Sequence, residues 1–161
     1  MTTWYQTLLD DRAGGVSLLK AEHASFQAVL ERLSGAVIVI GSGLRLAGEL
    51  LPQGVRYIAV EAHPVWLNGA WSPLREPPLI GGETLVAGAF EEHLPLREGA
   101  GDNAPAPWSL KHTTDPASVV ADVWRILKPG EVFFVVLEDI PYAWRSWIDN
   151  YLTYELVKAE A

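Results

Sequence analysis

The sequence of 161 residues predicts one α/β domain with a mostly parallel sheet of about five strands and helices on both faces. An unbroken β-branched run, Ala36–Ile40, is typical of a strand covered on both sides. The turn Gly41-Ser42-Gly43 follows it directly, and Glu61 closes a second apolar run over residues 55–61. Strand, glycine-rich turn, helix and acid-terminated strand, in this order, form the βαβ unit that binds nucleosides.

The first 34 residues are expected to form two helices, over 4–12 and 17–33. In the second helix the apolar residues recur at helical spacing and predict a face that packs on the sheet: Leu19, Phe26, Val29, Leu30 and Leu33. After the glycine turn, residues 44–51 predict a short helix, which Pro52 and Gly54 end. Residues 36–137 would then form the core of the domain.

The later elements follow from turn and capping signals. Residues 62–82 are rich in Pro and Trp and predict a loop, whereas residues 84–88 predict a short strand. Asp115 and Pro116 mark the start of a helix, which Lys128-Pro129-Gly130 ends, and residues 131–137 predict another buried strand. A final helix over residues 139–161 is expected from apolar residues three and four apart: Trp144, Trp147, Ile148, Tyr151 and Leu152.

Composition excludes several classes of protein. The chain has no cysteine, which excludes disulfides and thiolate metal sites and fits a reducing compartment. Twelve Lys and Arg against twenty Asp and Glu give a net charge of −8, which repels nucleic acid. No apolar run approaches the ~20 residues of a membrane span, and the start of the chain lacks a signal peptide. We therefore expect a cytoplasmic protein that binds neither membrane nor nucleic acid, and the scattered histidines predict no metal site.

Several segments together resemble one known family. They are the Val37-to-Gly43 stretch, Glu61 twenty residues after Gly41, Leu94-Pro95-Leu96, the segment from Trp108 to Pro116, and Arg125-Ile126-Leu127-Lys128-Pro129-Gly130. In order and spacing they resemble the class I methyltransferases that use S-adenosylmethionine, over roughly residues 36–137. The resemblance implies a Rossmann-like doubly wound sheet, here in a C-terminally truncated form.

The resemblance also implies a site for the cofactor S-adenosylmethionine. Gly41, Ser42 and Gly43 would lie under the cofactor, Glu61 and Ala62 would hold its ribose, and Ala89 with Phe90 or Glu91 would meet the adenine. Ser109 would complete the cofactor site. His112, near the expected methyl acceptor, would be a general base, although an exposed loop histidine explains it equally well.

The chain departs from the family pattern at several positions. Val39 stands where the family has an acid, and Leu44-Arg45 replaces the third glycine of the loop. Pro105 and Pro107 interrupt the expected fourth strand, so that strand either starts at Trp108 or is distorted. The absence of two further strands would leave residues 132–137 near an exposed edge, which predicts a homodimer in which a second copy covers either this strand or the helix with Trp144 and Trp147.

Three functions remain open at this point. The first is a methyltransferase for a small molecule, with an acceptor pocket lined by Trp66, Trp71 and Trp108. The second is a degenerate methyltransferase-like domain that serves as a binding or partner subunit. The third is another enzyme, such as a cyclase or isomerase, on the same scaffold, because fold alone does not choose between chemistries.

Overall fold

A computed structural model describes residues 24–42, 48, 50–62, 84–88, 93–107, 109–138 and 151–157 of the chain. Its elements are α3 (Ala24–Leu30), β1 (Ala36–Ile40), β2 (Arg56–Glu61), β3 (Thr84–Gly88), β4 (Gly101–Pro107), η2 (Leu110–His112), α5 (Pro116–Ile126), β5 (Leu127–Glu138) and β6 (Tyr151–Val157). The predicted helix over 4–12, the first part of the helix over 17–33 and most of the helix over 44–51 lie outside the described residues.

The strands form one six-stranded sheet in the order β3-β2-β1-β4-β5-β6. Every neighbouring pair from β3 to β5 is parallel, and β6 alone runs antiparallel, beside β5. The predicted α/β class with a mostly parallel, doubly wound sheet is therefore confirmed, with one strand more than expected. Residues 84–88 form the strand that the sequence predicts.

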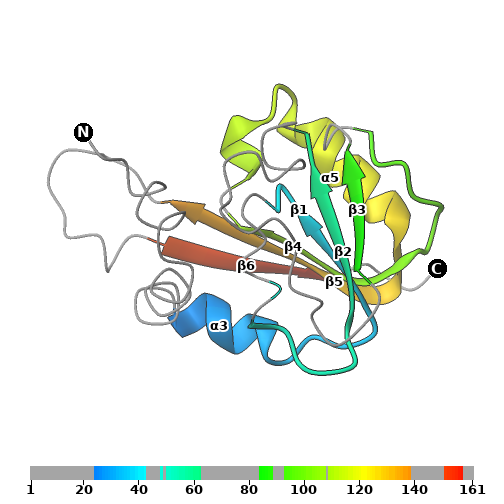
Figure 1. The fold of residues 1–161 in the computed structure, drawn as a ribbon. Coiled ribbons are helices and arrows are strands. Elements are labelled where there is room, and N and C mark those ends of the chain that lie inside the picture. Colours follow the sequence, from blue (N-terminus) through cyan, green and yellow to red (C-terminus); the bar gives the residue numbers. More distant parts are fainter. Residues whose placement is uncertain are drawn as a thin grey trace, which may run out of the picture.

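Two apolar layers cover the sheet, with α3 and α5 on opposite sides of it (Figure 1). Phe26, Val29 and Leu30 of α3 pack in one layer together with Val37 and Val39 of β1. The other layer joins α5 to the opposite side chains of the same strands, among them Ile38, Ile40, Val60, Val119 and Val123. Because β1 is fully buried along its length, it is the central strand that its β-branched run predicts.

The prediction of a helix over residues 139–161 is wrong for residues 151–157, which form β6. Each residue of β6 pairs with one of β5, from Val132↔Val157 to Glu138↔Tyr151. The expected exposed edge at residues 132–137 is therefore also wrong, because β6 lies along it. A homodimer formed by pairing at that edge loses its structural basis.

β4 contains both prolines, so the alternative of a strand that starts at Trp108 is wrong, and the register shift between Gly101 and Asn103 fits the alternative of a distorted sheet. β4 runs from Gly101 to Pro107, not from Trp108, and its pairing with β5 extends from Asn103↔Val132 to Pro107↔Val136. Between β4 and β1, the only residues paired in register are Asn103 and Val37. A proline has no N–H to donate to a neighbouring strand. Because β4 pairs with β5 residue by residue from Asn103 to Pro107, we infer that the N–H groups that Pro105 and Pro107 lack are ones that would have faced β1.

The last turn of α5 also differs from the prediction. The helix ends at Ile126, and Leu127 already belongs to β5, so Lys128-Pro129-Gly130 lies within a strand and not at the end of a helix. Between Gly101↔Leu127 and Asn103↔Val132, β5 advances by more residues than β4, which is an irregularity of the bulge type. Gly130, at a φ of 81°, supplies the left-handed residue that this bulge requires.

Candidate functional site at the carboxyl edge of the sheet

The carboxyl ends of β1, β2 and β4 meet at one edge of the sheet. The Ser42 amide, just after β1, donates a hydrogen bond to the Val60 carbonyl of β2 at 2.9 Å. This bond places Ser42 beside Glu61, the last residue of β2. Ser109, two residues after β4, lies against Gly41. In the sheet, β2 lies on one side of β1 and β4 lies on the other side. The strand order therefore reverses at β1, and the carboxyl ends of β1, β2 and β4 surround this point. Ligands usually bind at such a point in parallel sheets.

Gly41 is required by its conformation and by its neighbour. Its φ is +64°, in the left-handed region that disfavours residues with a Cβ. A Cβ added at Gly41 would overlap the Cβ of Ser109 and approach its hydroxyl to 3.1 Å. The space that a Cβ of Gly41 would need is therefore taken up by Ser109.

Glu61 is a buried carboxylate at the end of a central strand. Its exposed fraction is 8%, and it follows Val60, whose carbonyl accepts the Ser42 amide. Charged side chains are rarely buried unless they have partners. Glu61 is therefore not a solvated residue at the end of a strand, and it stays a candidate ligand-binding group.

Two buried hydroxyls lie on either side of Gly41. Ser42 is 9% exposed and Ser109 7%, and neither Oγ has a hydrogen-bond partner within the part of the chain that the structure describes. A buried hydroxyl without a partner costs about 1–3 kcal/mol. Such a cost is tolerated where a bound polar group supplies the missing bonds, and both hydroxyls lie where the strand order reverses.

His112 lies on the same segment as Ser109 but reaches solvent. Its amide donates to the Ser109 carbonyl at 2.9 Å, closing the short helix η2, and its side chain is exposed. Asp115 follows and caps α5 through its carboxylate, which accepts the amides of Ala117 and Ser118, as the Asp-Pro signal predicts. His112 as a general base stays a prediction.

The structure leaves several predicted site residues untested. Ala62 follows Glu61 at the edge and is partly buried. Gly43, Ala89, Phe90, Glu91, Trp66, Trp71 and Trp108 lie outside the described residues. Among the described residues, no group of three or more His, Cys, Asp or Glu side chains could hold a metal ion. None of the described helices combines the length and the apolar character needed to cross a membrane.

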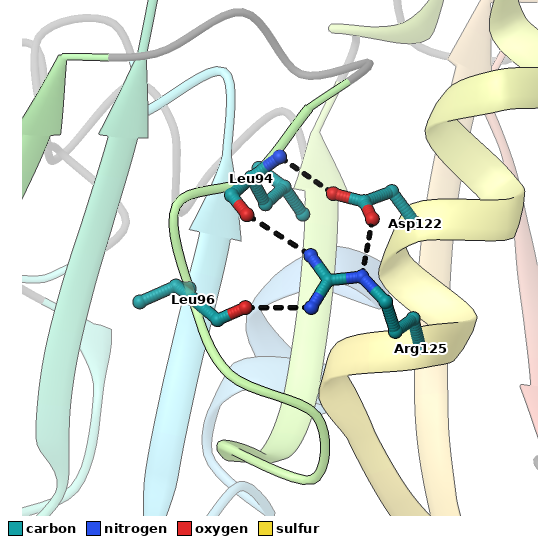
Figure 2. A network of polar contacts seen from close by, with 4 residues as sticks. All are labelled: Leu94, Leu96, Asp122 and Arg125. Atoms are coloured by element: carbon teal, nitrogen blue, oxygen red, sulfur yellow. Dashed lines mark hydrogen bonds and ion pairs between the residues drawn. The ribbon is translucent and has the colours of Figure 1, made fainter.

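The sequence interpretation missed a polar network that ties α5 to the segment before β4 (Figure 2). The Leu94 amide donates to Asp122 Oδ2 at 2.5 Å, and Arg125 donates to the carbonyls of Leu94 at 3.0 Å and Leu96 at 2.6 Å. Arg125 Nε also donates to Asp122 Oδ1 at 2.6 Å. We call these contacts the Asp122–Arg125 clamp. The signal for it was an i, i+3 acid–base pair on one helix face, a spacing common on exposed helices.

The clamp keeps both of its side chains charged. Burial acts to raise the pKa of Asp122, but the hydrogen bonds from Arg125 and from the Leu94 amide outweigh it and hold that pKa below its ordinary value. The hydrogen bond to Asp122 raises the pKa of Arg125. The pair therefore stays ionised through neutral pH.

A second polar lock lies at the opposite, amino edge of the sheet. Asp102 of β4 accepts the Ala36 amide at 2.7 Å and a hydrogen bond from Lys128. Burial acts to raise the pKa of Asp102, but the bonds from Lys128 and the Ala36 amide lower it below its ordinary value. Asp102 and Asp122 thus make the same kinds of contact, one backbone amide and one basic side chain, at different places in the domain.

Comparison with known proteins identifies the family. Residues 38–135, more than half of the chain, match a family model described as a methyltransferase domain. The chain belongs to this methyltransferase-domain family. The cofactor of the family is S-adenosylmethionine, and the matched residues of the domain run from β1 to β5.

Individual relatives match parts of the methyltransferase domain. The chain is 46% identical to the ubiquinone biosynthesis O-methyltransferase of Sodalis glossinidius over 55 residues. This aligned stretch covers 34% of this chain and 22% of that protein. The chain thus spans about a fifth of this curated relative.

Solved structures share the fold of the domain. The YcgJ protein of Bacillus subtilis superposes with a TM-score of 0.62 at 21% identity, over 74% of this chain and 51% of that one. A SAM-dependent methyltransferase from Aquifex aeolicus also superposes with a TM-score of 0.62, at 14% identity, over 81% of this chain and 72% of that one. The methyltransferase domain therefore has its family's fold, and spans about half the length of YcgJ.

Proposed function

We propose that this domain transfers a methyl group from S-adenosylmethionine to a small molecule, with the cofactor held across the carboxyl ends of β1, β2 and β4. The observation that carries the proposal is that this edge holds buried Glu61 and two buried hydroxyls, those of Ser42 and Ser109, which have no hydrogen-bond partner among the described residues. Family membership supports the reaction, and the O-methyltransferase of Sodalis glossinidius supports a small acceptor.

The chemistry of these three side chains fits the cofactor. The Glu61 carboxylate accepts hydrogen bonds from ribose hydroxyls, and its two oxygens allow both hydroxyls to be bound. The hydroxyls of Ser42 and Ser109 can donate and accept, so they suit the charged amino-acid end of the cofactor. Ala62 would border the ribose, and Gly43, Ala89 and Phe90 would complete the cofactor site.

Positioning would carry most of the catalysis. S-adenosylmethionine supplies a methyl group already activated by its sulfonium, so the domain has to align that group with the acceptor and exclude water. His112, on the segment after β4, would take the acceptor's proton. Trp66, Trp71 and Trp108 would line an acceptor pocket suited to an apolar or aromatic molecule.

Calorimetric titration with S-adenosylhomocysteine and S-adenosylmethionine tests the proposal. Glu61→Gln keeps the shape of the side chain but removes the charge, so affinity should fall about 10- to 100-fold, the range for a lost hydrogen bond to a charged group. Glu31→Gln is the matched control, because Glu31 is an exposed acid directly after α3, before the amino end of β1. It should bind as the unmodified protein does. Failure of the unmodified protein to bind either ligand would refute the proposal.

Val39 favours a second candidate function. It replaces the acid that the family has before the first glycine, and its side chain is fully buried in the apolar layer with α3. A domain without that acid could serve as a binding or partner subunit without methyl transfer. Bound S-adenosylhomocysteine with no turnover of any acceptor would favour this function over the first.

The oligomeric state and cellular location stay predictions. With β6 along β5, a homodimer would have to use another surface than the edge of β5, and the predicted alternative at Trp144 and Trp147 lies outside the described residues. Light scattering at high protein concentration tests this, and a single monomeric species would refute the dimer. A cytoplasmic location and a lack of affinity for nucleic acid are further proposals, the latter consistent with the net charge of −8.

A further inference from the structure

α5 holds the segment before β4 by its backbone. Three main-chain groups, the Leu94 amide and the carbonyls of Leu94 and Leu96, bond to side chains of α5. Figure 2 shows the segment running past the helix with these groups turned toward Asp122 and Arg125. Because main-chain atoms are held from both sides of Leu94, the clamp sets the position of that residue whatever its side chain is.

Leu94 in turn lies in the apolar layer beneath the proposed site. Its side chain is 2% exposed and belongs to the same buried cluster as Ile40, Val60 and Leu110. Each of these three residues is the immediate neighbour, along the chain, of a site residue: Gly41, Glu61 and Ser109. Protein interiors are close-packed and transmit displacements between touching side chains. A shift of Leu94 therefore reaches the cluster on which all three site segments rest.

We propose that Asp122 and Arg125 are positioning residues for the ligand-binding edge, acting through Leu94. The inference rests on the proposed function, since it concerns the affinity of that edge for the cofactor. Within the described part of the chain, the hydrogen bonds of Asp122 and Arg125 go to the segment before β4 and to each other, and Leu94 links that segment to the core.

Arginine is needed at position 125 for a geometric reason. Its guanidinium donates from three nitrogens at once, to Asp122 and to two carbonyls that are two residues apart. A lysine keeps the charge but has a single nitrogen, so it cannot hold the same three acceptors in a fixed plane. Arg125→Lys therefore loosens the clamp without removing its ion pair.

The test compares Arg125→Lys with Asp102→Asn. Asp102, like Asp122, accepts one backbone amide and one basic side chain, but it does so at the amino edge, away from the site. Both variants should lower the Tm by a few degrees. Only Arg125→Lys should weaken S-adenosylhomocysteine binding, by about 3- to 30-fold, the range for coupling through a packed network. Leu94→Ala, which removes the link, should weaken binding similarly, and combining it with Arg125→Lys should add little.

Amide exchange gives a readout that needs no ligand. The Ser42 amide is bonded to the Val60 carbonyl at the edge, and its exchange should be faster in Arg125→Lys than in Asp102→Asn. Unchanged affinity and unchanged Ser42 exchange in Arg125→Lys would overturn the inference. Faster exchange in a protein that binds no cofactor would refute the proposed function and leave the positioning role standing.

Discussion

Replacement of Gly41 by alanine tests the contact that brings β1 and β4 together at the site. Two costs add in Gly41→Ala. A φ of +64° costs a residue with a Cβ about 1–2 kcal/mol, and the overlap of the new Cβ with Ser109 costs a further ~1–3 kcal/mol, as for other overpacked sites. We expect the free energy of unfolding to fall by about 2–5 kcal/mol, measured by urea denaturation.

A control and a second variant separate the two costs. Gly54 also has a positive φ, of 85°, but a Cβ there would meet nothing within 4 Å. Gly54→Ala should therefore lose only the conformational part, about 1–2 kcal/mol. Ser109→Gly removes the atoms that the new Cβ meets, so in that background Gly41→Ala should cost no more than Gly54→Ala. Equal losses for Gly41→Ala and Gly54→Ala in the unmodified background would refute the assignment of Gly41 to the Ser109 contact.

Two further predictions concern the serine hydroxyls and the acid stability. Ser42→Ala and Ser109→Ala should each weaken binding of S-adenosylhomocysteine about 10-fold or more, while the Tm stays the same or rises. Binding of 5′-methylthioadenosine should not change, because this ligand lacks the amino-acid end. Equal losses of affinity for both ligands would contradict the assignment of the two hydroxyls to the amino-acid end of the cofactor. Because the folded-state pKa of Asp102 lies below its ordinary value, its bonds to Lys128 and Ala36 stabilise the fold above the unfolded-state pKa, and this contribution is lost as the pH falls through the folded-state pKa. Asp102→Asn should make the free energy of unfolding less dependent on pH below about pH 5, and an unchanged acid slope would contradict this.

The first half of the sheet could be predicted because local and tertiary signals agree there. Ala36–Ile40 is apolar throughout and is buried on both faces, and the glycine at position 41 is the residue that its positive φ requires. The acid at the end of β2 follows from the same βαβ pattern. These signals lie within ~26 residues of one another, so no distant contact was needed to interpret them.

The errors in the second half come from patterns that fit two structures. Tyr151 and Leu152 continue a helical spacing from Trp147, but Leu152, Tyr154 and Leu156 also alternate with polar residues, which is the period of a strand. Pairing with β5 decides for the strand. Strand propensity likewise argued against a strand that contains Pro105. In the structure, β5 nevertheless pairs with β4 at every residue from Asn103 to Pro107.

The sequence could predict which residues lie at the carboxyl edge of the sheet, but not how they pack against one another. Glu61 and Ser109 follow from motif positions, whereas the packing of Ser109 on Gly41 depends on a contact between residues far apart in the chain. The Asp122–Arg125 clamp was missed because its acceptors are main-chain groups of Leu94 and Leu96, and the identity of a side chain says nothing about where a distant carbonyl will lie.

In the single sheet, the strands β3-β2-β1 and β4-β5-β6 form two halves that meet where β1 lies beside β4, with the register pair Val37↔Asn103. Each half consists of three strands that are consecutive in the chain. Pairing within each half closes shorter loops than pairing of β1 with β4, so each half should gain order before the two halves join. On this reasoning we expect the carboxyl edge between β1 and β4, where a nucleoside would bind, to be completed late in folding.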